Sequence, residues 1–260
     1  MLGRSLKMAF WIFHDHLGLL LAANFIWALA VAVPLGLALP PLFAGDGELA
    51  LVIGIPSIYI GLFLCAPVLG AAITHLIKTL IDTRDAGLSD FFVGVRLYGV
   101  RAAALGLCYA VLTVAFCTSA WFYATKLGDT FPIAGYGISA LAVWGLAFVG
   151  FTTVYALPAL VQKKKGAIAT LRLSAQLVLA HPILTIGIAI QCLLLTFVAI
   201  AVLPLLLAGY GALVLCITSA AYELLARKYA PADSPADSYS VPNDDYLNRS
   251  LRDLFFPWKY

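Results

Sequence analysis

The chain has 260 residues, of which 63% are hydrophobic and 11% are charged. Ordinary soluble domains carry about 25% charged residues, so this composition excludes a soluble globular fold and favours one that lipid surrounds. The net charge is +3, and the basic residues are spread over several loops rather than gathered in the dense stripe of a nucleic-acid-binding protein.

Six apolar segments are long enough to cross a bilayer, which requires about 20 mostly apolar residues. The first four are predicted at about residues 17–43, 51–77, 98–123 and 132–160. The last two share an uncharged stretch of about 40 residues that begins near Pro182, and a break is expected near Pro204 to Gly211. The N-terminus does not read as a removable signal peptide, so we expect the first segment to be kept.

Two segments that precede spans have helical patterns of their own. Ser89 is the expected N-cap of the first, with Asp90 in its first turn and apolar residues at 91, 92, 95 and 98. This pattern predicts an interfacial helix that continues into the third span. Residues 166–182 predict a second such helix before the fifth span, with a bend at Pro182.

The basic residues are distributed unequally between the loops. When the six segments alternate across a bilayer, Lys126 falls on one side and the other fifteen of the sixteen Lys and Arg residues fall on the opposite side. An excess of Lys and Arg marks the cytoplasmic face. The predicted fold is therefore all-α, a polytopic membrane bundle of about six helices with both termini in the cytoplasm.

The chain divides into three parts. Residues 1–229 form the predicted transmembrane domain, residues 230–245 a linker rich in Pro, Asp and Ser, and residues 246–260 an amphipathic segment. The candidate contact residues of the last part are Leu247, Leu251, Leu254, Phe255 and Trp258. The four before Trp258 share one face of a short helix, which either lies on the chain's own bilayer or binds a partner.

Few polar residues lie deep in the predicted spans. Asn24 and Gln191 are the candidates for a substrate contact, because an amide both donates and accepts hydrogen bonds. The alternative is that they form hydrogen bonds between helices. The sequence shows no catalytic motif and no metal-ligand spacing around His75 or His181, and the five cysteines lie in apolar stretches. We therefore expect no catalytic residue, metal or cofactor.

The lysines Lys163, Lys164 and Lys165 form the densest basic run in the sequence. They are candidates for contact with anionic lipid headgroups or with a partner. The alternative is that the run serves as a topology signal, because recognition clusters usually contain about 4–8 basic residues.

Several prolines lie inside predicted spans, where each can break or kink a helix and free backbone carbonyls. They are Pro34, Pro40, Pro56, Pro67, Pro158 and Pro204. Residues 25–42 also resemble residues 142–160, in spans that run in opposite directions. This similarity fits either an inverted repeat of three plus three helices or chance composition.

Asn24, Trp27 and Pro34 resemble the pattern of the YesL-like family of bacterial membrane proteins, which is domain of unknown function 624. Residues 65–106 resemble the middle of that family, and residues 157–185 resemble its loop into the fifth helix. The resemblance covers about residues 8–228. It implies a six-helix protein of the bacterial cytoplasmic (inner) membrane that is associated with transport, and it supplies no catalytic residues.

The sequence favours a non-enzymatic accessory or scaffold protein that joins a transport system or larger membrane complex through its cytoplasmic face. Its expected partners are membrane lipids and another membrane or cytoplasmic protein, without nucleic acid. The alternative is a small-molecule or carbohydrate permease component, for which the prolines in the spans are the motivation.

Overall fold

The computed structural model describes residues 1–45, 47–128, 131–229 and 245–249, and within them the regular structure is entirely helical. Within these described residues, six helices are long and apolar enough to span a membrane, as predicted. They are Leu17–Phe43, Gly47–Thr83, Leu88–Leu127, Pro132–Lys163, Pro182–Ala201 and Leu206–Lys228. The predicted all-α polytopic architecture is therefore confirmed.

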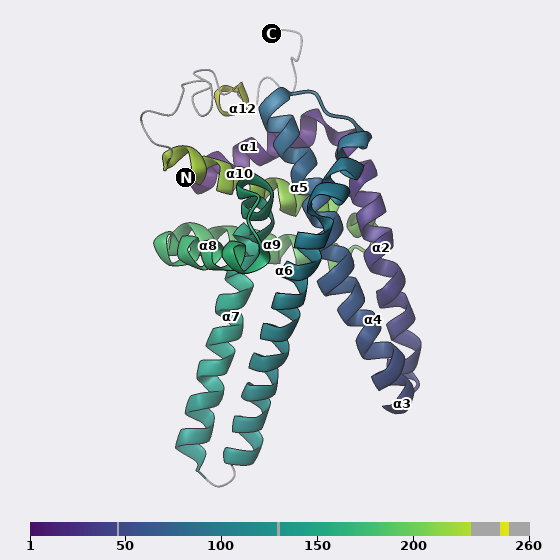
Figure 1. Cartoon of the computed structure of the whole chain (residues 1–260), viewed down its shortest axis with the longest axis vertical. Coiled ribbons are helices and arrows are strands. Elements are labelled where there is room, and N and C mark those ends of the chain that lie inside the picture. Colours follow the sequence, from purple (N-terminus) through teal and green to yellow (C-terminus); the bar gives the residue numbers. More distant parts are fainter. Residues whose placement is uncertain (46, 129–130, 230–244, 250–260) are drawn as a thin grey trace.

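Two long helical hairpins form the body of the molecule and separate like the arms of a fork (Figure 1). The first hairpin pairs α2 (Leu17–Phe43) with a returning helix of several segments. These are α3 (Gly47–Leu49), η1 (Ala50–Gly54), α4 (Ile55–Tyr59), η2 (Ile60–Cys65) and α5 (Ala66–Thr83). The second pairs α6 (Leu88–Phe122), extended by the π-helical turn η3 (Tyr123–Leu127), with α7 (Pro132–Lys163).

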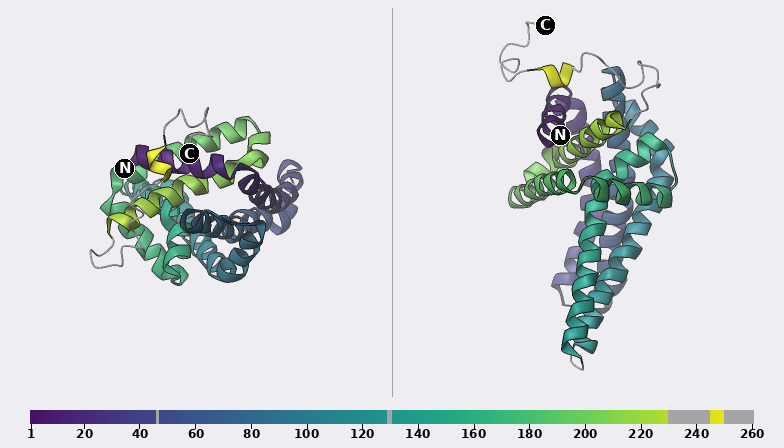
Figure 2. Two further views of the ribbon diagram at one scale, coloured as in Figure 1. Left: turned by 90° about the horizontal axis from the view of Figure 1, so that it is seen from above. Right: turned by 90° about the vertical axis from the view of Figure 1, so that its left-hand side faces the viewer.

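The other helices among the described residues close the end of the fork where the hairpins meet. They are α1 (Leu2–Asp15), α8 (Ala167–Ala180), α9 (Pro182–Ala201), η4 (Leu206–Tyr210), α10 (Gly211–Lys228) and the short α12 (Asp245–Asn248). Figures 1 and 2 show that α1, α8, α9 and α10 lie across the long axis that α2 and α7 follow. The two halves of the chain are therefore arranged differently, which argues against the inverted repeat.

Helix α10 is the central element of this cap. In the apolar part of the span Leu206–Lys228, which η4 and α10 form, 61% of residues are buried, against 17–28% in the other spans. Most of α10 therefore packs against protein, whereas the apolar sides of the other five helices are free to face lipid.

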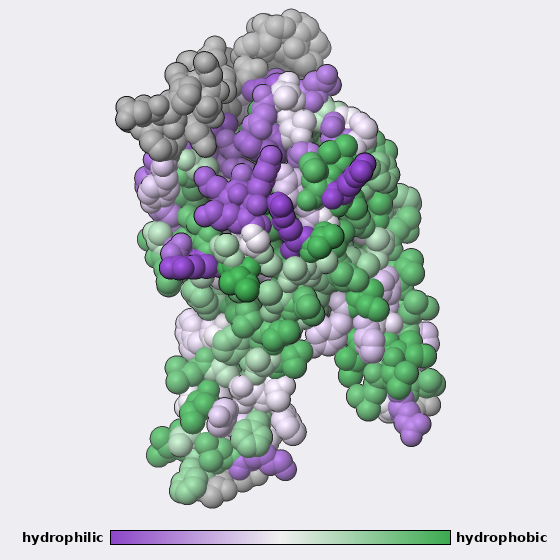
Figure 3. Space-filling model, viewed as in Figure 1, coloured by the Kyte–Doolittle hydropathy of each residue, from purple (hydrophilic) through white to green (hydrophobic). Residues whose placement is uncertain are grey.

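Polarity follows this architecture. Figure 3 shows hydrophilic residues gathered at the capped end, while the two arms below are mostly hydrophobic. Helices α1 and α12 both lie at the capped end (Figure 1). A bilayer that accommodates the hydrophobic arms and the apolar side of α9 leaves the hydrophilic residues of this end in water.

The prolines of the spans have different consequences. Pro34, Pro40 and Pro158 lie inside continuous helices, so none of the three prolines breaks its helix. Pro204 lies in the break before η4, where Gly209 has a φ of +127° that favours glycine. Pro67 follows the π-helical segment η2, and its missing N–H leaves the carbonyl of Phe63 without its α-helical donor.

The helices before spans three and five are present, and one end was predicted wrongly. Helix α6 runs from Leu88 without interruption, but its N-cap is Gly87 rather than Ser89. Asp90 lies in the first turn as expected, where its Oδ2 accepts the N–H of Gly87 at 2.9 Å. Helix α8 is separate from α9 and ends at the expected bend.

Helix α1 was missed in the sequence. Its buried face includes Met8, Trp11 and Ile12 at helical spacing, and this periodicity was the available signal.

Candidate functional site

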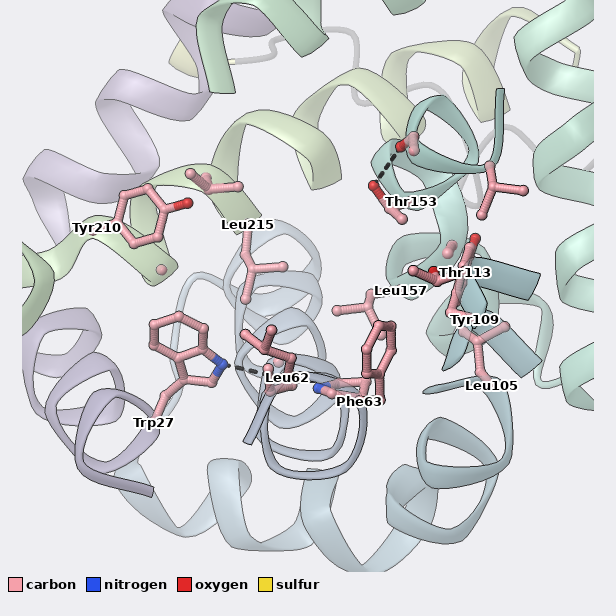
Figure 4. Close-up of a pocket in the computed structure, with 18 of the residues that line it drawn as sticks. Trp27, Leu62, Phe63, Leu105, Tyr109, Thr113, Thr153, Leu157, Tyr210 and Leu215 are labelled. Atoms are coloured by element: carbon pink, nitrogen blue, oxygen red, sulfur yellow. Dashed lines mark hydrogen bonds between the residues drawn. The ribbon is translucent and has the colours of Figure 1, made fainter. Parts of the chain in front are cut away.

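The described part of the molecule contains a cavity of about 480 Å³ where the two hairpins begin to separate. Its walls come from α2, η2 and α5 on one side, from α6 and α7 on the other, and from η4 and α10 at the capped end. Figure 4 shows Trp27 and Tyr210 facing Tyr109, Thr113 and Thr153 across it. The volume lies within the range of about 300–1,000 Å³ that is usual for small-molecule sites.

Trp27 and Tyr210 form the polar part of one wall, and both already have partners. The indole Nε1 of Trp27 donates to the carbonyl of Ala66 at 3.1 Å. The hydroxyl of Tyr210 shares a hydrogen bond of 2.7 Å with Thr196 on α9. These contacts hold α2 against α5 and η4 against α9.

The opposite wall contributes three hydroxyl groups. Tyr109 shares a 2.9 Å hydrogen bond with Thr152, and Thr153 donates to the carbonyl of Gly150 at 2.6 Å. Thr113 lines the cavity beside Tyr109 and forms no hydrogen bond with the described residues. The cavity is therefore apolar in character, with most of its polar groups already engaged.

The cavity is open on one side rather than sealed. Leu62 at its edge is 46% exposed, and Gly150 and Thr153 on α7 are exposed as well. A Cβ added to Gly150 would meet nothing within 4 Å. All three residues belong to helices that are candidate membrane spans, so in a bilayer the opening faces the lipid around these helices.

Asn24, predicted as a substrate contact, does not line this cavity. Its side chain is fully buried, and its Nδ2 donates to the carbonyls of Leu206 and Leu207 at 3.0 and 2.9 Å. Its Oδ1 accepts the backbone N–H of Ala212 at 3.1 Å. These bonds fix the break between α9 and α10 against α2, which is the interhelical role considered as the alternative.

Gln191 lies half-buried on α9 and is also outside the cavity walls. The structure therefore does not bring the two predicted amides into one site. Trp27, which follows the predicted contact residue Asn24 by one helical turn, does line the cavity. Sequence reasoning missed the cavity because its walls come from helices that are distant in the chain.

A buried ion-pair cluster joins α5, α7 and α10 near the capped end. The carboxylate of Glu223 is 7% exposed and lies 3.2 Å from Lys78 Nζ and 3.1 Å from Arg227 Nε. Gln162 Nε2 donates to the same carboxylate at 3.0 Å. Four side chains from three helices meet here outside the cavity, which indicates a structural role.

The three lysines of the basic run are exposed at the turn between α7 and α8. Lys164 has a left-handed backbone with a φ of +50°, and its carbonyl accepts Arg101 Nη1 at 3.1 Å. That contact uses the backbone carbonyl of Lys164 and not its ammonium group.

The C-terminal contact residues are described only in part. Leu251, Leu254, Phe255 and Trp258 lie outside the described residues. Leu247 is half-buried against the main core, and its carbonyl accepts Lys7 Nζ at 2.7 Å.

Two further residues of this segment hold it on the cap. Tyr246 is 1% exposed beneath the guanidinium of Arg84, which lies 3.8 Å from the ring centroid. Arg249 pairs with Asp15 at the end of α1. This part of the tail therefore docks on its own chain, which neither of the two expected modes included.

No group of His, Cys, Asp and Glu within the described residues could hold a metal ion. His181 Nε2 shares a 2.7 Å hydrogen bond with Tyr229, and His75 packs against Tyr98. The five cysteines are free, and Cys117 is exposed on α6.

No family model, curated protein or solved structure matches the chain. The resemblance of residues 8–228 to the YesL-like family therefore stays a prediction. The cavity, the ion-pair cluster and the docked tail are the observations on which functional proposals can rest.

Proposed function

We propose that this chain is an integral membrane protein without a chemical step of its own, an accessory or scaffold subunit of a transport system or larger membrane complex. It resides in the bacterial cytoplasmic membrane with both termini in the cytoplasm. The YesL-like resemblance and the charge asymmetry support this location.

The observation that carries the proposal is the contrast between the charges at the capped end. Glu223 pairs with Lys78 and Arg227, whereas the lysines 163–165 are exposed at the turn between α7 and α8. Residues of the cavity wall carry no carboxylate, amine, guanidinium, imidazole or thiol group. Exposed charges of this kind suit recognition of an acidic surface on a partner and offer no acid–base pair for catalysis.

The test is copurification of the full chain from its own membrane in mild detergent. A variant with Lys163, Lys164 and Lys165 all replaced by Gln should lose a partner that the parent retains in stoichiometric amount. Lys126→Gln, which changes an exposed lysine at the other end of the molecule, is the matched control. Retention of the same companions by the triple variant, or a parent without any, contradicts the proposal.

The orientation can be tested separately with single cysteines and a membrane-impermeant thiol reagent. Lys126→Cys should react in intact cells, whereas Lys164→Cys should react only after the membrane is opened. The parent chain measures the background from its own five cysteines. The reverse pattern contradicts the proposed topology.

The cavity favours a second candidate, a small-molecule permease component. Because most of its polar groups are engaged, the cavity suits an apolar or weakly polar molecule better than a carbohydrate. The flux of such a molecule across the membrane of reconstituted vesicles should then fall in Gly150→Leu and persist in Gly137→Leu. Equal flux in the two variants contradicts this candidate.

A further inference from the structure

The open cavity between the hairpins has a chemistry that selects one class of occupant. We infer that it binds the hydrocarbon chain of a membrane lipid, which enters sideways from the bilayer. This site is independent of the proposed docking through the capped end, because its walls lie between the arms of the fork.

The hydrogen-bonding groups of the walls exclude a strongly polar occupant. The donors of Trp27 and Thr153 are directed at backbone carbonyls, and Tyr109 is paired with Thr152. Each polar group of a ligand that stays unpaired in such a site costs about 1–3 kcal/mol. A sugar would bury several such groups, whereas an alkyl chain buries none.

Water is also a poor occupant of this space. An ordered buried water needs about 2–4 polar partners, and apolar cavities of engineered proteins stay dry. Thr113 supplies a single unpaired hydroxyl among the described wall residues. An empty space of this size would forfeit dispersion contacts along its whole lining, so filling it with hydrocarbon is favourable.

The side opening identifies the bilayer as the source of the chain. The exposed edge residues, Leu62, Gly150 and Thr153, lie on η2 and α7, which belong to spans two and four. Lipid chains surround these helices in a membrane, so a chain can enter without crossing water. Because lipid tails are as apolar as the walls, packing rather than the hydrophobic effect stabilises the bound chain.

Trp27 provides a direct probe of occupancy. The full chain is reconstituted into vesicles of dioleoylphosphatidylcholine and into vesicles of the same lipid brominated on its acyl chains, which quench tryptophan on contact. The contribution of Trp27 is obtained as the difference from a Trp27→Phe variant. Binding predicts clear quenching of Trp27 by the brominated chains.

Two glycines of α7 give a matched pair of variants. Neither Gly150 nor Gly137 has an atom within 4 Å of an added Cβ, and of the two only Gly150 lines the cavity. Gly150→Leu should occupy part of the cavity and reduce the quenching of Trp27, whereas Gly137→Leu should leave it unchanged. Circular dichroism checks that both variants fold, and Thr153→Leu on the same wall replaces Gly150→Leu if that variant does not.

The inference is overturned if brominated chains leave Trp27 unquenched. It is equally overturned if folded Gly150→Leu or Thr153→Leu is quenched as strongly as the parent, because the bromine would then reach Trp27 from outside the cavity.

Discussion

The side chain of Asn24 accepts a hydrogen bond from the backbone N–H of Ala212 at 3.1 Å, although the two residues are 188 positions apart. The same amide donates to two carbonyls of η4. A single buried residue of α2 thus satisfies the backbone groups that the break between α9 and α10 exposes.

Asn24→Ala should lower the free energy of unfolding by about 3 kcal/mol, because it leaves buried backbone groups without partners. The measurement is thermal unfolding in detergent. Gln191→Ala is the control, since this half-buried amide has no comparable contacts among the described residues and should change little. Equal effects of the two substitutions would contradict the role assigned to Asn24.

Gly106 permits α6 to lie directly on the backbone of η2. A Cβ at this position would lie 1.8 Å from the carbonyl oxygen of Phe63 and 2.7 Å from Pro67 Cγ. Gly106→Ala must therefore push the two hairpins apart, at a cost of about 1–3 kcal/mol in unfolding free energy.

Gly99→Ala is the matched control on the same helix, because its Cβ would be 3.6 Å from Val68. Thermal unfolding should distinguish the two alanine variants. If Gly106→Ala unfolds at the temperature of Gly99→Ala, the close approach of α6 to η2 is not required.

Glu223→Gln should destabilise the chain by about 3 kcal/mol, because it leaves Lys78 and Arg227 together near a buried site without their shared carboxylate. Asp82 is the other partner of Lys78, and its side chain is 50% exposed. Asp82→Asn should therefore cost at most about 1 kcal/mol. Unfolding in detergent measures both. A larger effect at Asp82 than at Glu223 would reverse the assignment of the buried cluster.

The tail contact predicts coupling between Arg249 and Asp15. Arg249→Gln and Asp15→Asn should each speed hydrogen exchange in residues 245–248. The double variant should exchange no faster than either single variant. Arg4→Gln, at an exposed position of α1, is the control. Additive effects would show that the two side chains act independently.

His16 lies at the corner between α1 and α2, and we expect it to make the stability of the fold depend on pH. Burial lowers the pKa of its imidazole from 6.5, and Arg84 and Arg249 lower this pKa further, although Asp15 raises it. Since the folded pKa lies below the unfolded one, stability should be constant above about pH 6.5 and decrease as the pH falls through that value. His16→Gln should remove this component from the pH profile of thermal unfolding, and an unchanged profile would contradict the assignment.

Particular residues show where sequence reasoning succeeded. The bounds of the first span were predicted at residues 17–43 and the structure has Leu17–Phe43. The break near Pro204 to Gly211 was also predicted, because proline and glycine act on their own backbone. The N-cap at Gly87 was missed, since Ser89 has the more usual capping side chain while Asp90 reaches back to Gly87 instead.

The sequence by itself determined the all-helical class, the six apolar segments and the uneven charge. These properties depend on stretches of neighbouring residues and on the length that a bilayer requires. The fork, its cavity and the docking of residues 245–249 on α1 were decided only by tertiary structure. They depend on contacts between distant segments, such as that of Asn24 with Ala212, which no local pattern encodes.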